Sequence, residues 1–429
     1  MQTGPSLSEV DPAAVPKTQI ISSGAAWAGA LNAWIAQGRT GPVARWLARE
    51  LDPDGVPRTL PVVEWLDAFR RLDEATRIRP AGWPEAFDAR AEGWFRALLR
   101  FSRPDGTPAF GPVGLPRPSG KLFHSWAERL ADPGFNTVAD WWFPQKTPST
   151  HAPPPLPADS RPDRPLAVLR ANWMRDGDFL TVDHRAAGPV SRVELFGRGR
   201  PWLGPDWDSA GDLAVGRARP TLWISHSTAD LAEWSFSVGK ARVTRTALLL
   251  RGRQLALLAE LWDGPGDPGS WRVGLTEGVD AGPMPDCRGL ALKAPRARVS
   301  PRALPIGLPR LPYTTDRGSF KAEGRSLRLA GPSSGRRAWR PLLLSWDPQR
   351  DRRPVHWRTL TVTEDRKVCG PDVAFAARVS WGRDEGLVVY KSLAPPAIRA
   401  FLGFQTKVKF LVGLFTCEGD VEPLVQVNE

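Results

Sequence analysis

The chain has 429 residues, with 44 Pro, 40 Gly and 20 Trp against only 2 Tyr. This composition favours many turns and short strands over long helices, and the length is sufficient for two domains with separate cores. There is no apolar run of about 18 residues and no basic segment followed by an apolar one at the N-terminus. We therefore expect neither a membrane span nor a signal peptide, and hence a cytoplasmic protein.

The net charge of +12 is concentrated in the second part of the chain. Residues 1–160 hold 17 Lys and Arg against 17 Asp and Glu, so the whole excess lies after residue 160, where Arg predominates. Because Arg binds carboxylate, sulfate and phosphate through two parallel hydrogen bonds, this part suits an acidic polysaccharide or a nucleic acid. An Arg-rich surface with no binding role is an equal alternative.

The first part of the chain is predicted to be helical. Residues 1–20 are expected to be a disordered lead, and an α-helical domain is predicted over residues 21–143. Apolar residues recur at helical spacing in four segments, which are Ala25–Ile35, Val43–Leu51, Leu60–Leu72 and Trp83–Phe101. These apolar stripes predict a helical core.

Two further features belong to this helical region. His124 and Glu128 lie one helical turn apart, but a metal site needs a third ligand, so we predict none. The aromatic run Trp141-Trp142-Phe143 either closes the domain against its neighbour or lines a cleft. The closing role is the stronger expectation, because large apolar side chains are buried by default.

Residues 144–165 are rich in Pro and predict an extended linker, and a β-sandwich domain is predicted over residues 166–429. Many short apolar segments recur there between Gly and Pro turns with no helical pattern between them, which indicates antiparallel strands. We expect two large sheets. The fold class is therefore α+β multidomain, a short helical domain followed by a large antiparallel sandwich.

Residues 232–264 form the centre of this predicted sandwich. Trp234, Phe236 and Val238 alternate with serines on a first strand, and turns at Gly239-Lys240 and at residues 251–253 separate two further apolar strands. These two are apolar on both faces, which predicts full burial. Thr244, Arg245 and Thr246 interrupt the middle strand, so we expect one of its ends to meet solvent.

Several segments resemble the heparinase II/III-like proteins, a group of polysaccharide lyases. The similar stretches are Val168–Trp173 with Asp178–Asp183, Gly199–Asp206, Thr244–Leu250 with Leu257–Glu260, and Arg399–Gly403. Together they extend over about three-fifths of the chain, and they match in strand pattern. The resemblance implies a partial α/α toroid followed by a β-sandwich, and a lyase that acts on an acidic polysaccharide.

The chain departs from that family at the positions of its metal-binding and catalytic residues. The family places a His-x-His-Asp type cluster, which holds a metal, before the Gly-x-Pro-Trp-like turn, whereas residues 188–194 contain no His. Active lyases also draw a Tyr or His base from the helical part, and residues 1–160 contain no Tyr and only His124 and His151. We therefore predict no metal and no cofactor.

Tyr313 and His184 remain as candidate catalytic residues. Arg310 and Arg317 flank Tyr313 and would lower the pKa of its phenol, which would suit a base that removes the C5 proton of a uronate. His184 is the histidine nearest to the family's cluster. The alternatives are an exposed loop tyrosine and a structural histidine.

Five residues near the family's turn are candidate substrate-binding residues: Arg192, Arg198, Arg200, Trp202 and Trp207. The arginines would hold carboxylates or sulfates, and the indoles would stack on sugar rings. A lyase is thus one hypothesis, and a non-catalytic polysaccharide-binding module on the same fold is the second. A nucleic-acid-binding protein ranks third, because no recognisable module is present.

The three cysteines, Cys287, Cys369 and Cys417, are far apart in the sequence and lack the spacing of a zinc ribbon. They permit one disulfide and require none.

Overall fold

The computed structural model describes residues 45, 47–78, 85–130, 132–145, 152–160, 164–185, 190–209, 216–265, 269–311, 318–331, 336–383, 385–416 and 418–428. The lead over residues 1–20 and the predicted helix Ala25–Ile35 lie outside these residues. The chain forms two compact units, Met1–Ala97 and Leu98–Glu429. The predicted linker at residues 144–165 is not the division between these two units.

The described residues of the first unit are mainly helical. A 3-10 turn, Val62–Glu64, leads into α3 (Trp65–Ile78), and α4 (Glu85–Arg100) follows. Both helices bury their apolar stripes, and Phe69 meets Trp94 edge to face at 5.6 Å between ring centroids. The turn before the helices contacts α4 directly, since a Cβ on Gly93 would lie 2.1 Å from the Asp54 carbonyl oxygen. Gly93 is therefore required for this close approach.

The second unit begins with two helices, α5 (Gly120–Arg129) and α6 (Gly134–Trp142), and α7 (Pro348–Asp351) is a single turn. The Pro-rich segment over residues 152–160 packs on this unit. The Thr137 hydroxyl donates to the Ala152 carbonyl at 2.8 Å, and the Trp173 indole donates to the Pro155 carbonyl at 2.7 Å. Prolines that exclude a helix thus hold the segment extended while neighbouring side chains fix it in place.

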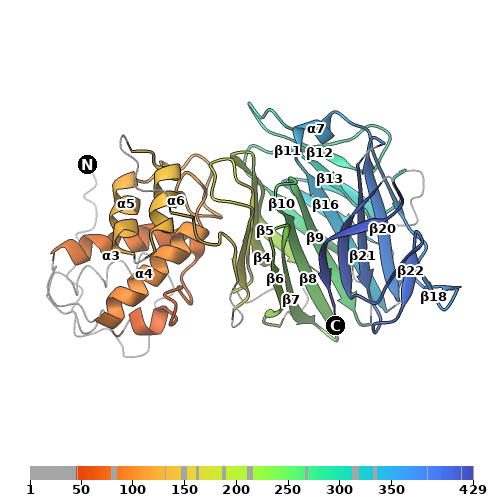
Figure 1. Ribbon diagram of the computed structural model, residues 1–429, viewed down its shortest axis with the longest axis horizontal. Helices are drawn as coiled ribbons and strands as arrows, with labels where there is room; N and C mark the ends of the chain where they lie inside the picture. Colours follow the sequence, from red (N-terminus) through yellow and green to blue (C-terminus); the bar gives the residue numbers. More distant parts are fainter. Residues whose placement is uncertain are drawn as a thin grey trace, which may run out of the picture. The chain divides into compact units, whose positions relative to one another are not determined.

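The described strands of this unit form four antiparallel sheets (Figure 1). The first has the order β1-β2-β3-β4-β5-β10-β15-β14. Its strands are Asp159–Ser160, Leu166–Arg170, Phe179–Asp183, Val190–Gly197, Arg200–Ser209, Ser270–Leu275, Ser326–Ala330 and Ser319–Glu323, in that order. The second has the order β11-β12-β13-β16-β9-β8-β7-β6. Its strands are Asp280–Pro283, Leu290–Lys293, Arg302–Leu304, Arg337–Ser345, Leu255–Asp263, Ala241–Leu250, Ala229–Val238 and Arg219–Ser225.

The third and fourth sheets are smaller. The third has the order β17-β20-β21-β24-β25, with strands Val355–Thr359, Ala374–Trp381, Glu385–Ser392, Phe410–Phe415 and Val421–Val427. The fourth has the order β19-β18-β22-β23, with strands Lys367–Val368, Thr363–Glu364, Arg399–Phe401 and Phe404–Thr406.

The second sheet is buried on both faces. On β8, Ala247 and Leu249 pack against the first sheet, whereas Leu248 and Leu250 pack against the third. The same alternation holds on β9 and β16, because successive side chains of a strand point to opposite faces. The other face of the third sheet packs against the fourth sheet around Tyr390 and Phe401. The sheets therefore stack as layers, with apolar side chains between each neighbouring pair.

The structure confirms the antiparallel strands and the central ladder of the sequence analysis, and it corrects the expected number of sheets. Strand β7 pairs with β8 and β8 with β9, with turns where they were predicted. The strands that the structure describes form four sheets rather than the two expected. One end of the middle strand β8 meets solvent as expected, at exposed Arg242 and half-buried Thr244, whereas Arg245 and Thr246 are fully buried.

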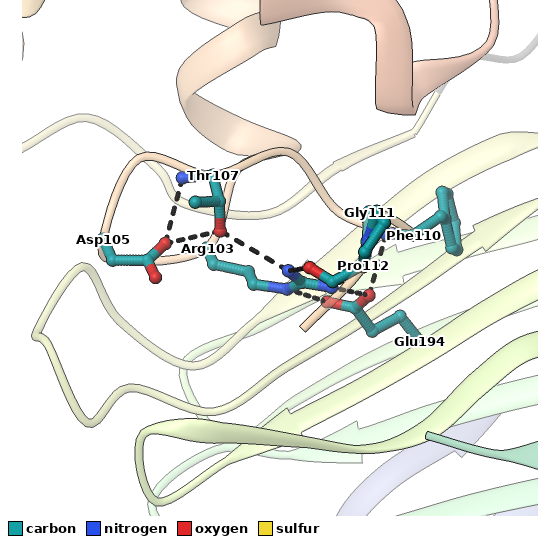
Figure 2. A network of polar contacts seen from close by, with 7 residues as sticks. All are labelled: Arg103, Asp105, Thr107, Phe110, Gly111, Pro112 and Glu194. Atoms are coloured by element: carbon teal, nitrogen blue, oxygen red, sulfur yellow. Dashed lines mark hydrogen bonds and ion pairs between the residues drawn. The ribbon is translucent and has the colours of Figure 1, made fainter. Parts of the chain in front are cut away.

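A loop that follows α4 is fixed to the first sheet by one ion pair (Figure 2). Arg103 donates from Nε and Nη2 to the two carboxylate oxygens of Glu194 on β4, at 2.9 and 2.8 Å. The same Arg103 guanidinium holds the loop's own Gly111 and Pro112 carbonyls, at 2.6 and 3.3 Å. Burial alone would lower the pKa of Arg103. The hydrogen bonds and the negative charge of Glu194 have the larger combined effect, so the pKa of Arg103 is raised.

Among the helices that the structure describes, none has both the length and the apolar character that crossing a membrane requires.

Candidate functional site

An open hollow of about 640 Å³ lies beside α5 in the second unit. It is lined by α5 itself, by the segment just before α5, by the end of α6 and the residues that follow it, and by the turn that joins β2 to β3. The charged and titratable residues that line it are Arg117, Lys121, His124, Glu128 and Arg175.

The sequence of α5 places its polar residues on the hollow. Ser119 caps the helix by accepting a hydrogen bond from the Lys121 backbone N–H at 3.3 Å. One face of the helix is buried through Leu122, Phe123, Trp126 and Ala127. Positions 121, 124, 125 and 128 lie on the opposite face, because a helix returns to the same side every three to four residues.

His124 is held in place by two oxygen acceptors. Its Nε2 lies 2.8 Å from the Phe143 carbonyl oxygen, and its Nδ1 lies 3.5 Å from the Asp140 carboxylate. Its side chain is 14% exposed. Both ring nitrogens thus face protein oxygen atoms, which fix the orientation of the ring at the hollow.

Arg175 reaches the hollow from the turn between β2 and β3. Its Nε and Nη2 donate to the carbonyls of Trp141 and Trp142 at 3.0 and 2.9 Å, while the residue stays exposed. The aromatic run beside it combines a buried and a lining residue. Trp142 is buried and donates to the Trp173 carbonyl at 2.7 Å, whereas Phe143 stacks on Phe123 and lines the hollow.

The hollow carries a positive charge. Arg117, Lys121 and Arg175 face a single carboxylate, that of Glu128, among the described residues that line it. Arg117 and Lys121 are exposed, so their charged groups are available to a ligand. This arrangement can bind a polymer that carries carboxylates or sulfates.

His184, one of the predicted catalytic residues, lies elsewhere and is buried. It follows β3, is 2% exposed, and its Nδ1 is hydrogen-bonded to the Ser191 hydroxyl. Burial, and after it the charge of Arg245, lowers the pKa of His184 well below its usual value. The ring is therefore neutral and enclosed in the core, where no polysaccharide can reach it, and this corrects the expectation that it acts as a base.

The charge beside His184 belongs to a buried network that sequence reasoning did not find. Arg245 donates from Nε to Glu260 at 2.9 Å and from Nη1 to the Ser191 hydroxyl at 2.5 Å, and its Nη2 donates to Ser209. The guanidinium also lies against the Trp207 ring, 4.9 Å from its centroid. Burial lowers the pKa of Arg245 and raises the pKa of Glu260. The ion pair acts in the opposite direction on both groups, because each charge stabilises the charged form of its partner.

This region does not fit the metal that the heparinase II/III-like resemblance implies. Within the ranges of the chain that the structure describes, no three His, Cys, Asp or Glu side chains lie close enough together to hold a metal ion. Next to His184, the positive group is the Arg245 guanidinium, which donates hydrogen bonds and cannot act as a ligand. The Arg245 guanidinium thus supplies a positive charge beside His184, where the family would have metal ligands.

The predicted substrate-binding residues are not brought together. Arg198 and Arg200 share the turn between β4 and β5, and Arg192 lies near the other end of β4. Trp202 and Trp207 are both fully buried between the first two sheets. Their indole faces are therefore not open to a sugar, which corrects the stacking role expected for them.

Arg200 is the predicted arginine with the most defined contacts. Its Nη1 donates to the Pro295 carbonyl at 3.0 Å, and its guanidinium lies over the Trp202 ring at 5.2 Å. Burial lowers the pKa of Arg200. Arg198 is exposed, and Arg192 is half-buried. None of the three lines the hollow beside α5.

Tyr313 and His151 lie outside the described residues, so the role of Tyr313 stays a prediction. Sequence reasoning missed the cations of the hollow. The polar positions 121, 124, 125 and 128 of α5 were a usable signal, since they form the face opposite the apolar stripe. Arg175 gave no signal, because only the fold brings its turn to α5.

No protein-family model matches this sequence, and no curated protein matches it. Solved structures are similar in fold. The heparan sulfate lyase HepC from Pedobacter heparinus superimposes with a TM-score of 0.56 at 12% identity, over 86% of this chain and 65% of that one. Heparinase III, the BT4657 gene product, superimposes with a TM-score of 0.59 at 12% identity over the same shares. The chain thus spans about 65% of the length of these structures, and the likeness is one of fold.

Proposed function

We propose that this chain, which has a heparinase-like fold, binds an acidic polysaccharide in the hollow beside α5. The observation that carries the proposal is the set of three cations, Arg117, Lys121 and Arg175, around one open hollow. Support also comes from the solved structures of similar fold, one of which is a heparan sulfate lyase. The helices from α3 to α6 would then correspond to a shortened toroid.

The physical basis of binding is charge together with shape. The volume of about 640 Å³ lies within the range of roughly 300–1,000 Å³ that is typical of ligand sites. Arg117 and Arg175 offer planar donors to carboxylate or sulfate groups, and Lys121 adds a mobile ammonium group. Because the hollow is open, a long chain can pass through it with only part of its length in contact.

Lyase activity is a second candidate, favoured by the likeness to a heparan sulfate lyase. In such a reaction a base removes the C5 proton of a uronate, the electron pair forms the C4–C5 double bond, and the C4–O bond breaks. The leaving oxygen then takes up a proton. Tyr313 is the residue we propose as the base, since His184 is enclosed in the core and both ring nitrogens of His124 face acceptors.

Calorimetric titration against a panel of polymers tests the binding proposal. The panel contains heparan sulfate, chondroitin sulfate, neutral dextran and double-stranded DNA. Binding to a sulfated or uronate-containing polysaccharide, but not to dextran, is expected. Preference for DNA over every polysaccharide would instead support the third hypothesis, and binding to none of them would overturn the proposal.

Ultraviolet absorbance of the unsaturated uronate, recorded on the same acidic polymers, separates a lyase from a binding module. A rise in absorbance that Tyr313→Phe abolishes, with binding retained, would establish elimination and its base. Binding without any rise would identify a module that does not cleave its polymer.

A further inference from the structure

A second cavity, of about 730 Å³, lies between β16 of the second sheet and the edge of the third and fourth sheets. Strands β16 and β20, from different sheets, both contribute to its lining. Its walls combine aromatic, cationic and hydroxyl or thiol side chains, contributed by Arg337, Trp339, Thr359, Thr361, Cys369 and Phe375. It shares no residue with the hollow beside α5.

Two aromatic rings form a rigid wall of this cavity. Trp339 meets Phe375 edge to face, with 4.9 Å between the ring centroids. Trp339 also contacts Phe410 at 6.3 Å, so its indole is held from two sides. A rigid aromatic wall favours a ligand with a flat or ring-shaped apolar surface, because no side-chain freedom is lost when the ligand is bound.

The charge at this cavity is positive. Arg337 lies two residues before Trp339 on β16 and therefore points to the same face of the strand. Its Nε is 3.3 Å from the Asp263 carboxylate, and its side chain is 29% exposed. Arg340 is the other charged residue at the walls, and neither Asp nor Glu is present among the described residues that line the cavity.

We propose that this cavity binds a small organic anion with a ring-shaped body, whose carboxylate or sulfate meets Arg337 and whose ring packs against the wall formed by Trp339 and Phe375. A uronate-containing disaccharide and an aromatic carboxylate share this chemistry. The proposal is independent of the polysaccharide site, since the two sites have no residue in common and either could be empty while the other is filled.

Cys369 supplies a direct reporter for occupancy. It is a free cysteine that lines the cavity and is partly exposed, whereas Cys287 is free but buried. Burial raises the pKa of the Cys369 thiol, against the effect of Arg399, so alkylation is carried out at mildly alkaline pH. Labelling of each cysteine by iodoacetamide is followed by peptide mass spectrometry.

The experiment compares ligands on the intact chain. An unsaturated uronate disaccharide and benzoate are tested against a neutral disaccharide and benzyl alcohol, their uncharged counterparts. At a ligand concentration about ten times its Kd, labelling of Cys369 should slow about tenfold, because only the empty fraction reacts. Protection by one acid alone identifies the source of the ligand. Protection by neither acid, or equal protection by the uncharged compounds, would overturn the proposal.

Two neighbouring arginines give a matched pair of variants. Arg336 and Arg337 both lie beside Asp263, at 3.6 and 3.3 Å, but only Arg337 lines the cavity. Arg337→Gln should abolish protection and Arg337→Lys should retain part of it, whereas Arg336→Gln should leave it unchanged. Cys287 must stay unlabelled in each variant, which shows that the fold is intact. Full protection in Arg337→Gln would contradict the proposed anion contact.

Discussion

Arg103 and Glu194 are 91 positions apart in the sequence and form a two-point ion pair that is almost entirely hidden from solvent (Figure 2). The Glu194 carboxylate also accepts the Phe110 backbone N–H at 2.8 Å. One carboxylate on the first sheet thus fixes both the side chain and the backbone of the loop that leads toward α5. The position of the proposed polysaccharide site depends on this loop, because Arg117 follows it directly.

Replacing Arg103 with Met is expected to destabilise the second unit strongly. The change leaves a buried carboxylate with one backbone donor, and breaking such pairs costs about 3–5 kcal/mol. The free energy of unfolding, measured by urea denaturation, checks this. The double variant Arg103→Met, Glu194→Leu should recover part of the loss, because the buried carboxylate is removed with its partner, while buried Arg170 loses a nearby negative charge and the Phe110 N–H loses its acceptor.

An exposed ion pair serves as the control for this prediction. Arg328 and Glu323 are 3.2 Å apart, with side chains 42% and 33% exposed. Arg328→Met should change the free energy of unfolding by less than about 1 kcal/mol, as is usual for surface pairs. Equal losses in Arg103→Met and Arg328→Met would contradict the role assigned to burial.

Asp178 is expected to make stability depend on pH. Its burial raises the pKa of its carboxyl to about 6, against the hydrogen bond from the Trp346 indole at 2.8 Å. Between its ordinary pKa of 3.8 and about 6, the folded protein keeps a proton that the unfolded chain has lost. Stability therefore falls as the pH rises through this window, by up to about 3 kcal/mol, and the loss persists above it.

Asp178→Asn removes this proton exchange. The variant should lose the fall in stability across that pH window and be more stable than the parent at neutral pH, as measured by urea denaturation at several pH values. Asp176→Asn, an exposed change in the same turn, should keep the fall in stability and only narrow its pH window slightly, because the Asp176 charge is the smallest of the effects on the pKa of Asp178. A profile of Asp178→Asn that matches the parent would refute the assignment.

Gly93→Ala is expected to destabilise the first unit, although Ala is the better helix former by about 1 kcal/mol. A Cβ at this position would lie 2.1 Å from the Asp54 carbonyl oxygen, so the turn at Asp54-Gly55 would have to separate from α4. Limited proteolysis and thermal unfolding measure the effect. A rise in the melting temperature would show that the turn does not pack on α4 as the structure has it.

The strands were predictable from the sequence, but the number of sheets was not. The alternation in Trp234, Phe236 and Val238 and the two-sided apolar runs after it identify β7, β8 and β9. A strand with apolar residues on both faces must be covered on both sides, but the sequence does not show which elements cover it. The third and fourth sheets come from residues after 354, and only their packing against the second sheet reveals the layers.

Arg245 shows why the polar sites were harder to predict. A lone arginine in an apolar run is usually exposed, yet its partners Ser191, Ser209 and Glu260 come from three other strands. Burial became favourable only because the fold supplies all of them at once. The candidate site is similar, since Arg175 is more than forty residues from α5 in the sequence. Local pattern alone could not join the two.

The most direct test of the proposed site is the affinity of Arg117→Gln, Lys121→Gln for a size-defined heparan sulfate fragment, measured by calorimetry at several salt concentrations. Lys367→Gln, an exposed lysine on the fourth sheet, is the control. Removing two contacting cations should weaken binding about tenfold or more and make it less dependent on salt, whereas the control should match the parent. Unchanged affinity of the double variant would contradict the site.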